Sequence, residues 1–306
     1  MTLRRLILSA ALLCASLSIV VPTHAQNAAI TTDPAPDKSN PASMQSFQLP
    51  SHGALLNALI YIAPGVGPHP TVILLHGFPG NEKNLDIAQT LRRAGYDVLY
   101  FNYRGSWGSP GDFSFTHGIE DVDAAIDYLR TPANAAKLRA DPNRLIIAGH
   151  SMGGMFSAIL GAEHSKDPWL KAVVLISAAN MAGRTLPAVQ AHQQDAALPQ
   201  VAKGLASNGL SPLAGCTAES LAKELFANAA AWNIPDLAPK LAAHPLIVIS
   251  SDDGNTATTD ILIANLTKLG DTQVKATHIP TDHSYSDHRI ALQKSILEAL
   301  ANLNTK

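Results

Sequence analysis

Cysteine is nearly absent from this chain of 306 residues, which contains only Cys14 and Cys216. Cys14 lies in an opening segment that we interpret below as a removable signal, and one remaining cysteine cannot form an internal disulfide. The fold must therefore depend on its hydrophobic core, for which 46% of the residues are hydrophobic. Because Cys216 follows a loop-like stretch, Ser211-Pro212-Leu213-Ala214-Gly215, with no strand before it, we do not interpret it as a nucleophile.

An excess of basic charge is also absent. The chain has 22 Lys and Arg residues against 24 Asp and Glu residues, and its net charge of −2 becomes −4 without Arg4 and Arg5. Proteins that bind nucleic acid or an anionic membrane surface usually present clustered basic residues. The composition therefore predicts neither kind of partner.

The chain lacks a hydrophobic run suited to a membrane span. The run from Leu6 to Val21 is about 16 residues, short for a span, and it is interrupted by serines. It follows Arg4 and Arg5 and ends near the small residue Ala25, which is the pattern of a secretory signal. We therefore predict a signal peptide at residues 1–25 and an exported protein, periplasmic or secreted. A membrane anchor is the rival interpretation.

Residues 26–44 have few large apolar side chains and contain three prolines. Such a composition cannot bury enough apolar surface to order a chain. We predict a disordered spacer there, followed by one folded domain at 45–306 in which order begins near Phe47.

From residue 71 onward, short apolar segments alternate with segments that have helical periodicity. Continuous apolar runs of this length are typical of strands buried on both faces of a parallel sheet. The alternation predicts an α/β fold with a mostly parallel central sheet and helices on both faces. Strands are expected at 55–62, 71–75, 98–101, the run ending at Gly149, 172–176, 246–249 and 274–279, and helices at 82–94, 116–130, after Ser151, 258–269 and 289–303.

About 65 residues, from 178 to 243, separate two of these strands, which is far longer than an ordinary connection. Ala-rich helical pieces in this segment are broken by five prolines. We predict a helical cap insertion that forms part of a substrate pocket. The alternative is a surface excursion that covers the sheet edge.

Gly149-His150-Ser151-Met152-Gly153 fits the pattern Gly-x-Ser-x-Gly between an apolar strand and a helix, the context of a nucleophile elbow. A tight turn would present the Ser151 hydroxyl, and the two glycines would let neighbouring backbone pass close to it. The N–H of Met152 would then point toward developing negative charge. Ser151 is the predicted nucleophile. The alternative is a Gly-rich turn with an idle serine.

A second motif, His76-Gly77-Phe78-Pro79-Gly80, directly follows the strand at 71–75. A serine nucleophile needs an oxyanion hole with a second donor, and the N–H of Phe78 is the natural one because Pro79 has none. For His76, at the strand end, we expect a structural hydrogen bond. The motif could also be only a turn.

An orienting acid and a base are expected near the carboxyl ends of the last strands. Asp252 and Asp253 both follow the strand at 246–249 and compete for the role of acid. His283 lies in a polar loop before the last helix and is the predicted base, with His288 as its rival. A metal site built from Asp282, His283, Asp287 and His288 lacks recognisable zinc spacing, so we predict no metal and no cofactor.

These motifs resemble the α/β-hydrolase superfamily from about Phe47 to the C-terminus, including the chain order of Ser, Asp and His. The resemblance is strongest to small carboxylesterases, dienelactone-hydrolase-like proteins and the catalytic domains of prolyl-oligopeptidase-like peptidases. In such proteins the acid stands three residues after the small residue that ends its strand, here Ser250, which implies Asp253. The matching pieces are 76–80, 103–108, 149–154, Asp252-Asp253 and 282–284.

The resemblance implies a serine hydrolase that cleaves carboxylic esters through an acyl-enzyme, with a small molecule as substrate. His283 would be the base, Asp253 the orienting acid, and Phe78 and Met152 the oxyanion donors. Substrate contacts are expected from Tyr103, Trp107 and His150, although the stretch around Tyr103 could simply shape the pocket wall. The alternatives are a serine peptidase or amidase acting on short peptides and a non-catalytic ligand-binding homologue.

Overall fold

The computed structural model describes residues 28–301, so the predicted signal peptide at 1–25 lies outside the described residues. Eight strands form one sheet: β1 (Ser43–Ser51), β2 (Ala54–Ile62), β3 (His69–Leu75), β4 (Asp97–Phe101), β5 (Ala140–His150), β6 (Leu170–Ile176), β7 (Leu246–Ser251) and β8 (Lys275–Ile279). Their spatial order is β1-β2-β4-β3-β5-β6-β7-β8. β1 and β2 pair antiparallel, β2 pairs antiparallel with β4, and all remaining pairs are parallel. This confirms the predicted class.

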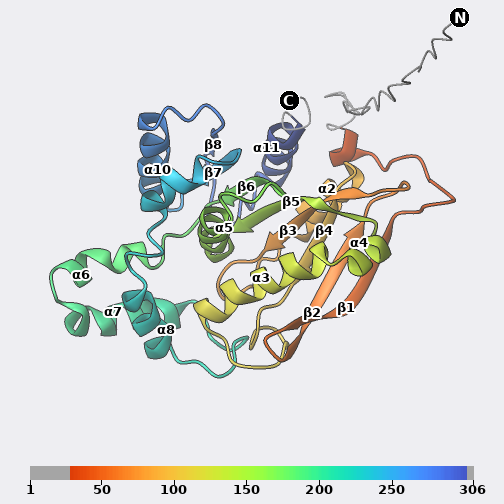
Figure 1. Cartoon of the computed structure of the whole chain (residues 1–306). Helices are drawn as coiled ribbons and strands as arrows, with labels where there is room; N and C mark the ends of the chain where they lie inside the picture. The colour runs from red at the N-terminus through yellow and green to blue at the C-terminus, as the bar shows by residue number, and fades with distance from the viewer. Residues whose placement is uncertain (1–27, 302–306) are drawn as a thin grey trace, which may run out of the picture.

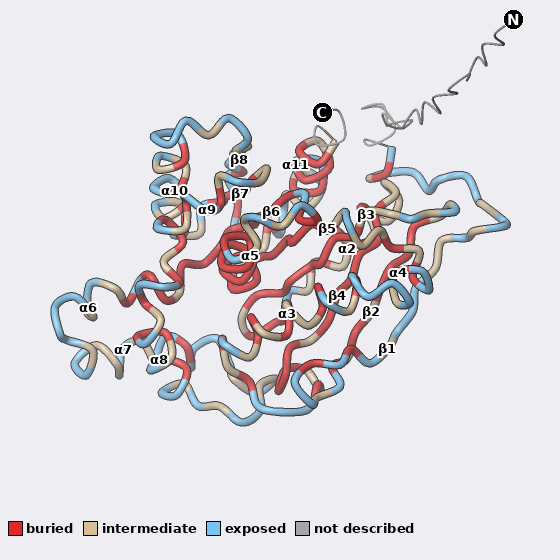
Figure 2. The backbone as a smooth tube through the Cα atoms, viewed as in Figure 1, coloured by how far each residue is buried: buried red, intermediate tan, exposed pale blue. Residues whose placement is uncertain are grey.

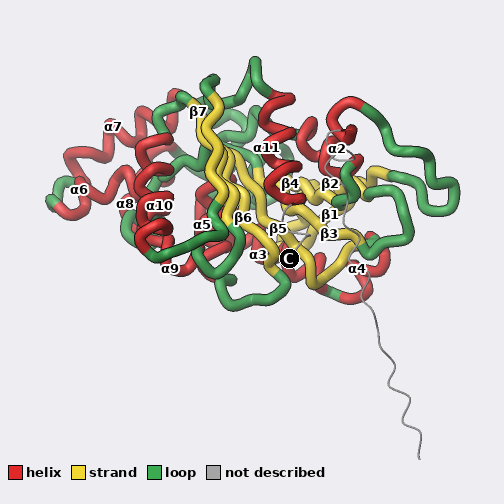
Figure 3. The backbone as a smooth tube through the Cα atoms, turned by 90° about the horizontal axis from the view of Figure 1, so that it is seen from above, coloured by secondary structure: helices red, strands yellow, loops and turns green. Residues whose placement is uncertain are grey.

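Helices cover both faces of the sheet (Figures 1 and 3). One face carries α3 (Phe115–Arg130), α4 (Pro132–Leu138), α5 (Met152–Glu163) and α10 (Thr256–Lys268), and the other carries α2 (Leu85–Arg93) and α11 (Arg289–Ala301). Side chains of β3 alternate between the two cores: Ile73 and Leu75 join the first, Val72 and Leu74 the second. Both faces of the strand are therefore buried, which explains its continuous apolar sequence.

α5 is the most deeply placed helix, buried along almost its whole length (Figure 2). It begins directly after β5 with Met152 and packs against β5, β6 and β3. Glycines at its start allow this close approach, since a Cβ on Gly153 would lie 2.3 Å from the carbonyl oxygen of Leu75 at the end of β3. The start of α5 is therefore locked against the end of the neighbouring strand.

The first ordered segments begin earlier than the sequence predicts. β1 starts at Ser43 rather than near Phe47, because it pairs with β2 from Ser43–Ile62 to Ser51–Ala54. Residues 28–31 are also helical, and Ala29 is buried against the core beside α2, where its carbonyl oxygen accepts a hydrogen bond from Arg93. Part of the segment predicted as a disordered spacer thus packs on the domain.

The long segment between β6 and β7 is helical. Its part from residue 186 to 227 lies to one side of the sheet (Figure 1), and its part from residue 234 to 241 packs against α5 and α10. It consists of η1 (Gly183–Thr185), α6 (Leu186–Gln190), α7 (Gln194–Ser207), α8 (Ala218–Ala227), η2 (Ile234–Leu237) and α9 (Ala238–Leu241). None of the helices within residues 28–301 is long and apolar enough to cross a membrane.

Two sets of hydrogen bonds hold this helical segment on the domain. The N–H groups of Trp107 and Phe113 donate to the carbonyl oxygens of Pro212 and Ala214, at 2.9 Å each. Glu224 of α8 accepts from the N–H groups of Phe115 and Thr116, at 2.9 and 2.7 Å, so it caps the N-terminus of α3. The segment therefore contacts the loop after β4 and the helix that follows it.

Candidate active site

Ser151 occupies a turn between β5 and α5 with φ 59° and ψ −117°, a conformation that a non-glycine residue rarely adopts. Neighbouring backbone holds it there. The Ser151 N–H donates to the carbonyl oxygen of Ile176 at 2.9 Å, and the Ser151 carbonyl accepts from Ala179 at 3.0 Å and from Met155 at 3.2 Å. The sharp turn sets the serine at the carboxyl end of a central strand.

The turn after β3 passes directly over Ser151. A Cβ placed on Gly77 would lie 3.0 Å from the Cβ of Ser151 and 3.5 Å from its Oγ, so only glycine fits without displacement. Phe78 is the next residue along this turn, and Met152 opens α5, where the first N–H groups have no partner within the helix. The two predicted oxyanion donors thus belong to segments that flank Ser151.

His283 and Asp253 form a close pair, with 2.6 Å between the imidazole Nδ1 and the carboxylate Oδ2. Asp252 instead lies 3.1 Å from Nε2 of His278. The Asp252 side chain is 65% exposed, whereas the Asp253 side chain is 1% exposed. Between the two aspartates left open by the sequence, the geometry therefore places Asp253 against the predicted base.

The carboxylate of Asp253 is buried yet well supplied with donors. Burial alone would raise its pKa, but hydrogen bonds from His283, Asn255 and Ser177 outweigh burial and hold the pKa far below its usual range. Asn255 supplies both its backbone N–H, at 2.8 Å, and its side-chain Nδ2, at 3.0 Å. Asp253 is therefore ionised, as a group that orients an imidazole must be.

A buried hydroxyl cluster, formed by Ser177, Ser251 and Tyr285, lies beside this pair. Ser177 Oγ is 2.8 Å from both Ser251 Oγ and the Tyr285 hydroxyl, which donates to the carbonyl oxygen of Ile249 at 3.2 Å. Burial raises the pKa of Tyr285 to about 12, so its hydroxyl remains protonated. Sequence reasoning missed this cluster. The available signal was a tyrosine two residues after His283.

The three predicted substrate-contact residues lie in different surroundings. Tyr103 is fully buried against Phe156, and its hydroxyl donates to the carbonyl oxygen of His76 at 3.2 Å. Trp107 is partly exposed and donates from Nε1 to the carbonyl oxygen of Pro79 at 2.8 Å. His150 is 3% exposed and lies against His283. Tyr103 and Trp107 therefore support the turn after β3, and His150 supports the loop of His283. A substrate contact by any of the three stays a prediction.

His76 is buried with its Nδ1 donating to the carbonyl oxygen of Gly77 at 2.8 Å. Burial lowers the pKa of its imidazole to about 4, so the ring is neutral near neutral pH. This is a structural hydrogen bond of the kind expected at that strand end.

The four residues weighed as a metal site are divided among different contacts. His283 pairs with Asp253, and His288 Nδ1 lies 2.8 Å from Asp287 Oδ1. Asp282 accepts from the N–H groups of Ser284 and Ser286, at 3.1 and 2.8 Å, and Asp287 accepts from Thr281. Within residues 28–301, no group of three His, Cys, Asp or Glu side chains is arranged to hold a metal ion.

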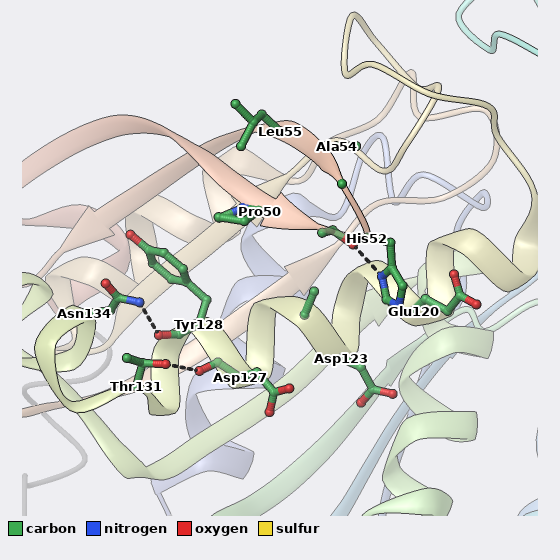
Figure 4. A pocket seen from close by; sticks show the side chains of 13 residues that line it. Pro50, His52, Ala54, Leu55, Glu120, Asp123, Asp127, Tyr128, Thr131 and Asn134 are labelled. Atoms are coloured by element: carbon green, nitrogen blue, oxygen red, sulfur yellow. Dashed lines mark hydrogen bonds between the residues drawn. The ribbon is translucent and has the colours of Figure 1, made fainter.

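A groove of about 620 Å³ lies elsewhere, between the β1–β2 turn and α3 (Figure 4). Its lining includes three carboxylates of α3, of which Glu120 pairs with Arg104 and Asp123 with His164. Across the groove from α3, His52 projects from the β1–β2 turn (Figure 4). None of Ser151, Asp253 and His283 lines this groove, so we assign it no part in the chemistry.

Comparisons with known proteins agree with the observed fold. A family model described as alpha/beta hydrolase fold matches residues 70–264. Esterase EstD of Thermotoga maritima is 29% identical over 140 residues, which cover 43% of this chain and 32% of that protein. Lysophosphatidylserine lipase ABHD12 of Gallus gallus is 32% identical over 91 residues, which cover 28% of this chain and 21% of that protein. The chain thus matches a third or less of the length of these curated relatives.

Solved structures show the same fold at low sequence identity. Est1E from Butyrivibrio proteoclasticus, with ferulic acid bound, has a TM-score of 0.60 and 19% identity, covering 85% of this chain and 99% of that one. An esterase from Pyrobaculum calidifontis has a TM-score of 0.61 and 20% identity, covering 86% of each chain. EstE1, a carboxylesterase cloned from a metagenomic library, has a TM-score of 0.61 and 18% identity, covering 92% of this chain and 93% of that one.

Proposed function

Since the chain belongs to the alpha/beta hydrolase fold family, we propose that it is an exported serine hydrolase that cleaves small carboxylic esters. The observation that carries the proposal is the strained turn at Ser151, overlain by the turn at Gly77 and accompanied by the His283–Asp253 pair at 2.6 Å. An ester is the substrate class because several similar proteins are named esterases.

In the first step, Ser151 Oγ attacks the ester carbonyl and His283 Nε2 accepts its proton. Asp253 accepts from Nδ1 of His283, which keeps the proton on Nδ1 and leaves Nε2 free to act as base. The same carboxylate then stabilises the imidazolium. Collapse of the tetrahedral intermediate releases the alcohol, which takes the proton from His283.

The N–H groups of Phe78 and Met152 would stabilise the oxyanion of that intermediate. Each donor of this kind lowers a barrier by about 3 kcal/mol, because it is already oriented when the charge develops. In the second step, His283 takes a proton from water, which attacks the acyl carbonyl. Collapse of this second tetrahedral intermediate breaks the bond to Ser151 Oγ, which takes the proton back from His283, and the carboxylic acid is released. These two steps balance in atoms and protons without a cofactor.

The direct test is hydrolysis of a p-nitrophenyl ester series, from acetate to palmitate, by the wild type and by Ser151→Ala. We expect Ser151-dependent turnover, with loss by a factor of about 10⁴ or more in the variant. The preferred acyl length then gives the size of the pocket, to which the helical segment at 178–243 is proposed to contribute as a cap.

Other outcomes of this test point to the alternatives. Turnover that persists in Ser151→Ala would exclude Ser151 as the nucleophile. Absence of turnover on every ester, together with cleavage of aminoacyl or dipeptidyl amides, would favour a peptidase. Absence of both would favour a non-catalytic binding protein.

Export forms a separate part of the proposal and rests on the sequence of residues 1–25 alone. We expect the protein recovered from the periplasm or medium of a bacterial host to begin at Gln26, as read by mass spectrometry of the intact protein. A full-length product retained in the cytoplasm would contradict export and leave the esterase proposal intact.

A further inference from the structure

His150, the residue before the proposed nucleophile, contacts the proposed base. Its Nε2 lies 2.7 Å from the carbonyl oxygen of His283, and the centroids of the two rings are 4.6 Å apart with an interplanar angle of 40°. Because a carbonyl oxygen can only accept, Nε2 of His150 must carry the proton. The bond joins two residues 133 positions apart in the chain.

The loop that carries His283 is fixed at three successive residues. The carbonyl oxygen of Ser284 accepts from Nη1 of Arg289 at 2.9 Å, and Tyr285 is anchored by its hydroxyl in the buried cluster with Ser177. His150 holds His283 itself. Arg289 and Tyr285 therefore fix the path of the loop, while His150 fixes the main chain from which the imidazole extends.

We propose that His150 is a positioning residue, which holds the His283 backbone through its Nε2–H and thereby sets the imidazole base relative to Ser151. This role rests on the proposed serine hydrolase function. It explains why a polar side chain lies almost fully buried directly before Ser151. It also differs from a substrate contact, since the ring's donor is already used.

The charge of His150 suits this position. Burial, and then the charge of the nearby His283, lower the pKa of His150 to about 4. The hydrogen bond to the His283 carbonyl and the charge of Asp253 oppose this shift in pKa, and Arg289 reinforces it. The second ring nitrogen, Nδ1, is buried and has no hydrogen-bond partner among the described residues. A neutral ring does not repel the positive charge that His283 acquires when it takes the Ser151 proton, whereas a protonated ring 4.6 Å away would.

Two substitutions of similar size separate the hydrogen bond from packing. His150→Met keeps a long side chain without a donor, and His150→Gln keeps a terminal N–H donor. We expect His150→Met to lower kcat by about tenfold to a hundredfold, because a small displacement of a catalytic group has effects of that order. KM should stay within about twofold, and His150→Gln should restore most of kcat.

A matched control is available in His244, whose Nε2 lies 3.1 Å from the carbonyl oxygen of His164, the same kind of bond at a different place. His244→Met should leave kcat and KM unchanged. The wild type and Ser151→Ala, assayed in parallel, separate the two proposals: without Ser151-dependent turnover in the wild type, the proposed function itself fails.

Two results would overturn the role of His150 while the wild type remains active. One is a kcat unchanged in His150→Met, whether or not KM rises. The other is a His150→Gln variant that is no more active than His150→Met. If His150→Met does not fold, nitrogen NMR of the wild type decides the point. We expect a neutral His150 protonated at Nε2, and protonation at Nδ1 instead would contradict the proposal.

Discussion

Ser151 is held in a conformation that costs about 1–3 kcal/mol for a residue with a side chain. Its neighbours offset this cost, because the backbone of Ser151 makes hydrogen bonds with Ile176 at the end of β6 and with Ala179 just beyond it. The position of Ser151 is therefore fixed by the neighbouring strand β6 as well as by β5, the strand that precedes it. Strain maintained in this way is typical of functional sites rather than of ordinary turns.

The two neighbouring aspartates give a prediction at the same scale. Asp253→Asn should lower kcat by a factor of about 10⁴, because an amide cannot hold His283 in the tautomer that leaves Nε2 free. Asp252→Asn should change kcat by less than about twofold, since Asp252 is 65% exposed and contacts His278. The measurement is kcat on the best ester of the series, and the opposite ranking would make Asp252 the acid.

At the scale of elements, the helical segment between β6 and β7 is tied to the active-site side of the sheet. Trp107 links the two, since its N–H donates to Pro212 of that segment while its indole donates to Pro79 of the turn over Ser151. A displacement of the segment would therefore act on the turn that carries Phe78. This connection gives the segment a route to influence the proposed oxyanion hole as well as the proposed substrate pocket.

The junction of α3 and α5 holds a pH-dependent contact. His164, which follows α5, lies 2.8 Å from Asp123 of α3 and 2.7 Å from Asp167. The hydrogen bond with Asp123 raises the pKa of His164, burial opposes this, and Asp167 adds to the rise. The folded-state pKa thus exceeds the unfolded value of about 6.5, so the contribution is complete below that value and is lost as pH rises through the folded pKa.

His164→Gln should accordingly lower the free energy of unfolding more at pH 5.5 than at pH 9, values about one unit below and well above the ordinary histidine pKa. Urea denaturation of the wild type and the variant at both pH values measures the difference. Asp123→Asn should remove much of the same pH dependence. An equal loss of stability at both pH values would show that the contact acts through packing and not through charge.

At the scale of the whole molecule, the fold could be predicted because it depends on patterns that are local in sequence. The run from Val72 to Leu75 is apolar throughout because its side chains alternate between two buried cores. Ile73 and Leu75 belong to the core that includes α3 and α5, and Val72 and Leu74 belong to the core that includes α2 and α11. A parallel sheet of such strands brings the residues that follow β3, β5 and β7 to one edge. This is why Ser151, and the pair Asp252 and Asp253, could be named as candidates from short motifs.

The supporting contacts could not be predicted, because they join residues that are distant in sequence. Ser177 and Tyr285 are 108 residues apart, and Asn255 gives no sign in the sequence that it donates twice to Asp253. The early start of β1 has a similar cause, since its exposed polar residues are ordered by pairing with β2 and not by their own apolar pattern. These contacts and the start of β1 depend on hydrogen bonds that form only in the folded chain, so the local sequence does not reveal them.

The measurement that tests the central claim most directly is covalent labelling with a fluorophosphonate, followed by mass spectrometry of the peptides. We predict one phosphonyl group per chain on Ser151, no label in Ser151→Ala, and much slower labelling in Asp253→Asn, because the attack needs a correctly oriented His283. Label on another residue, or none on a folded wild-type protein, would contradict the assignment of Ser151 as the nucleophile.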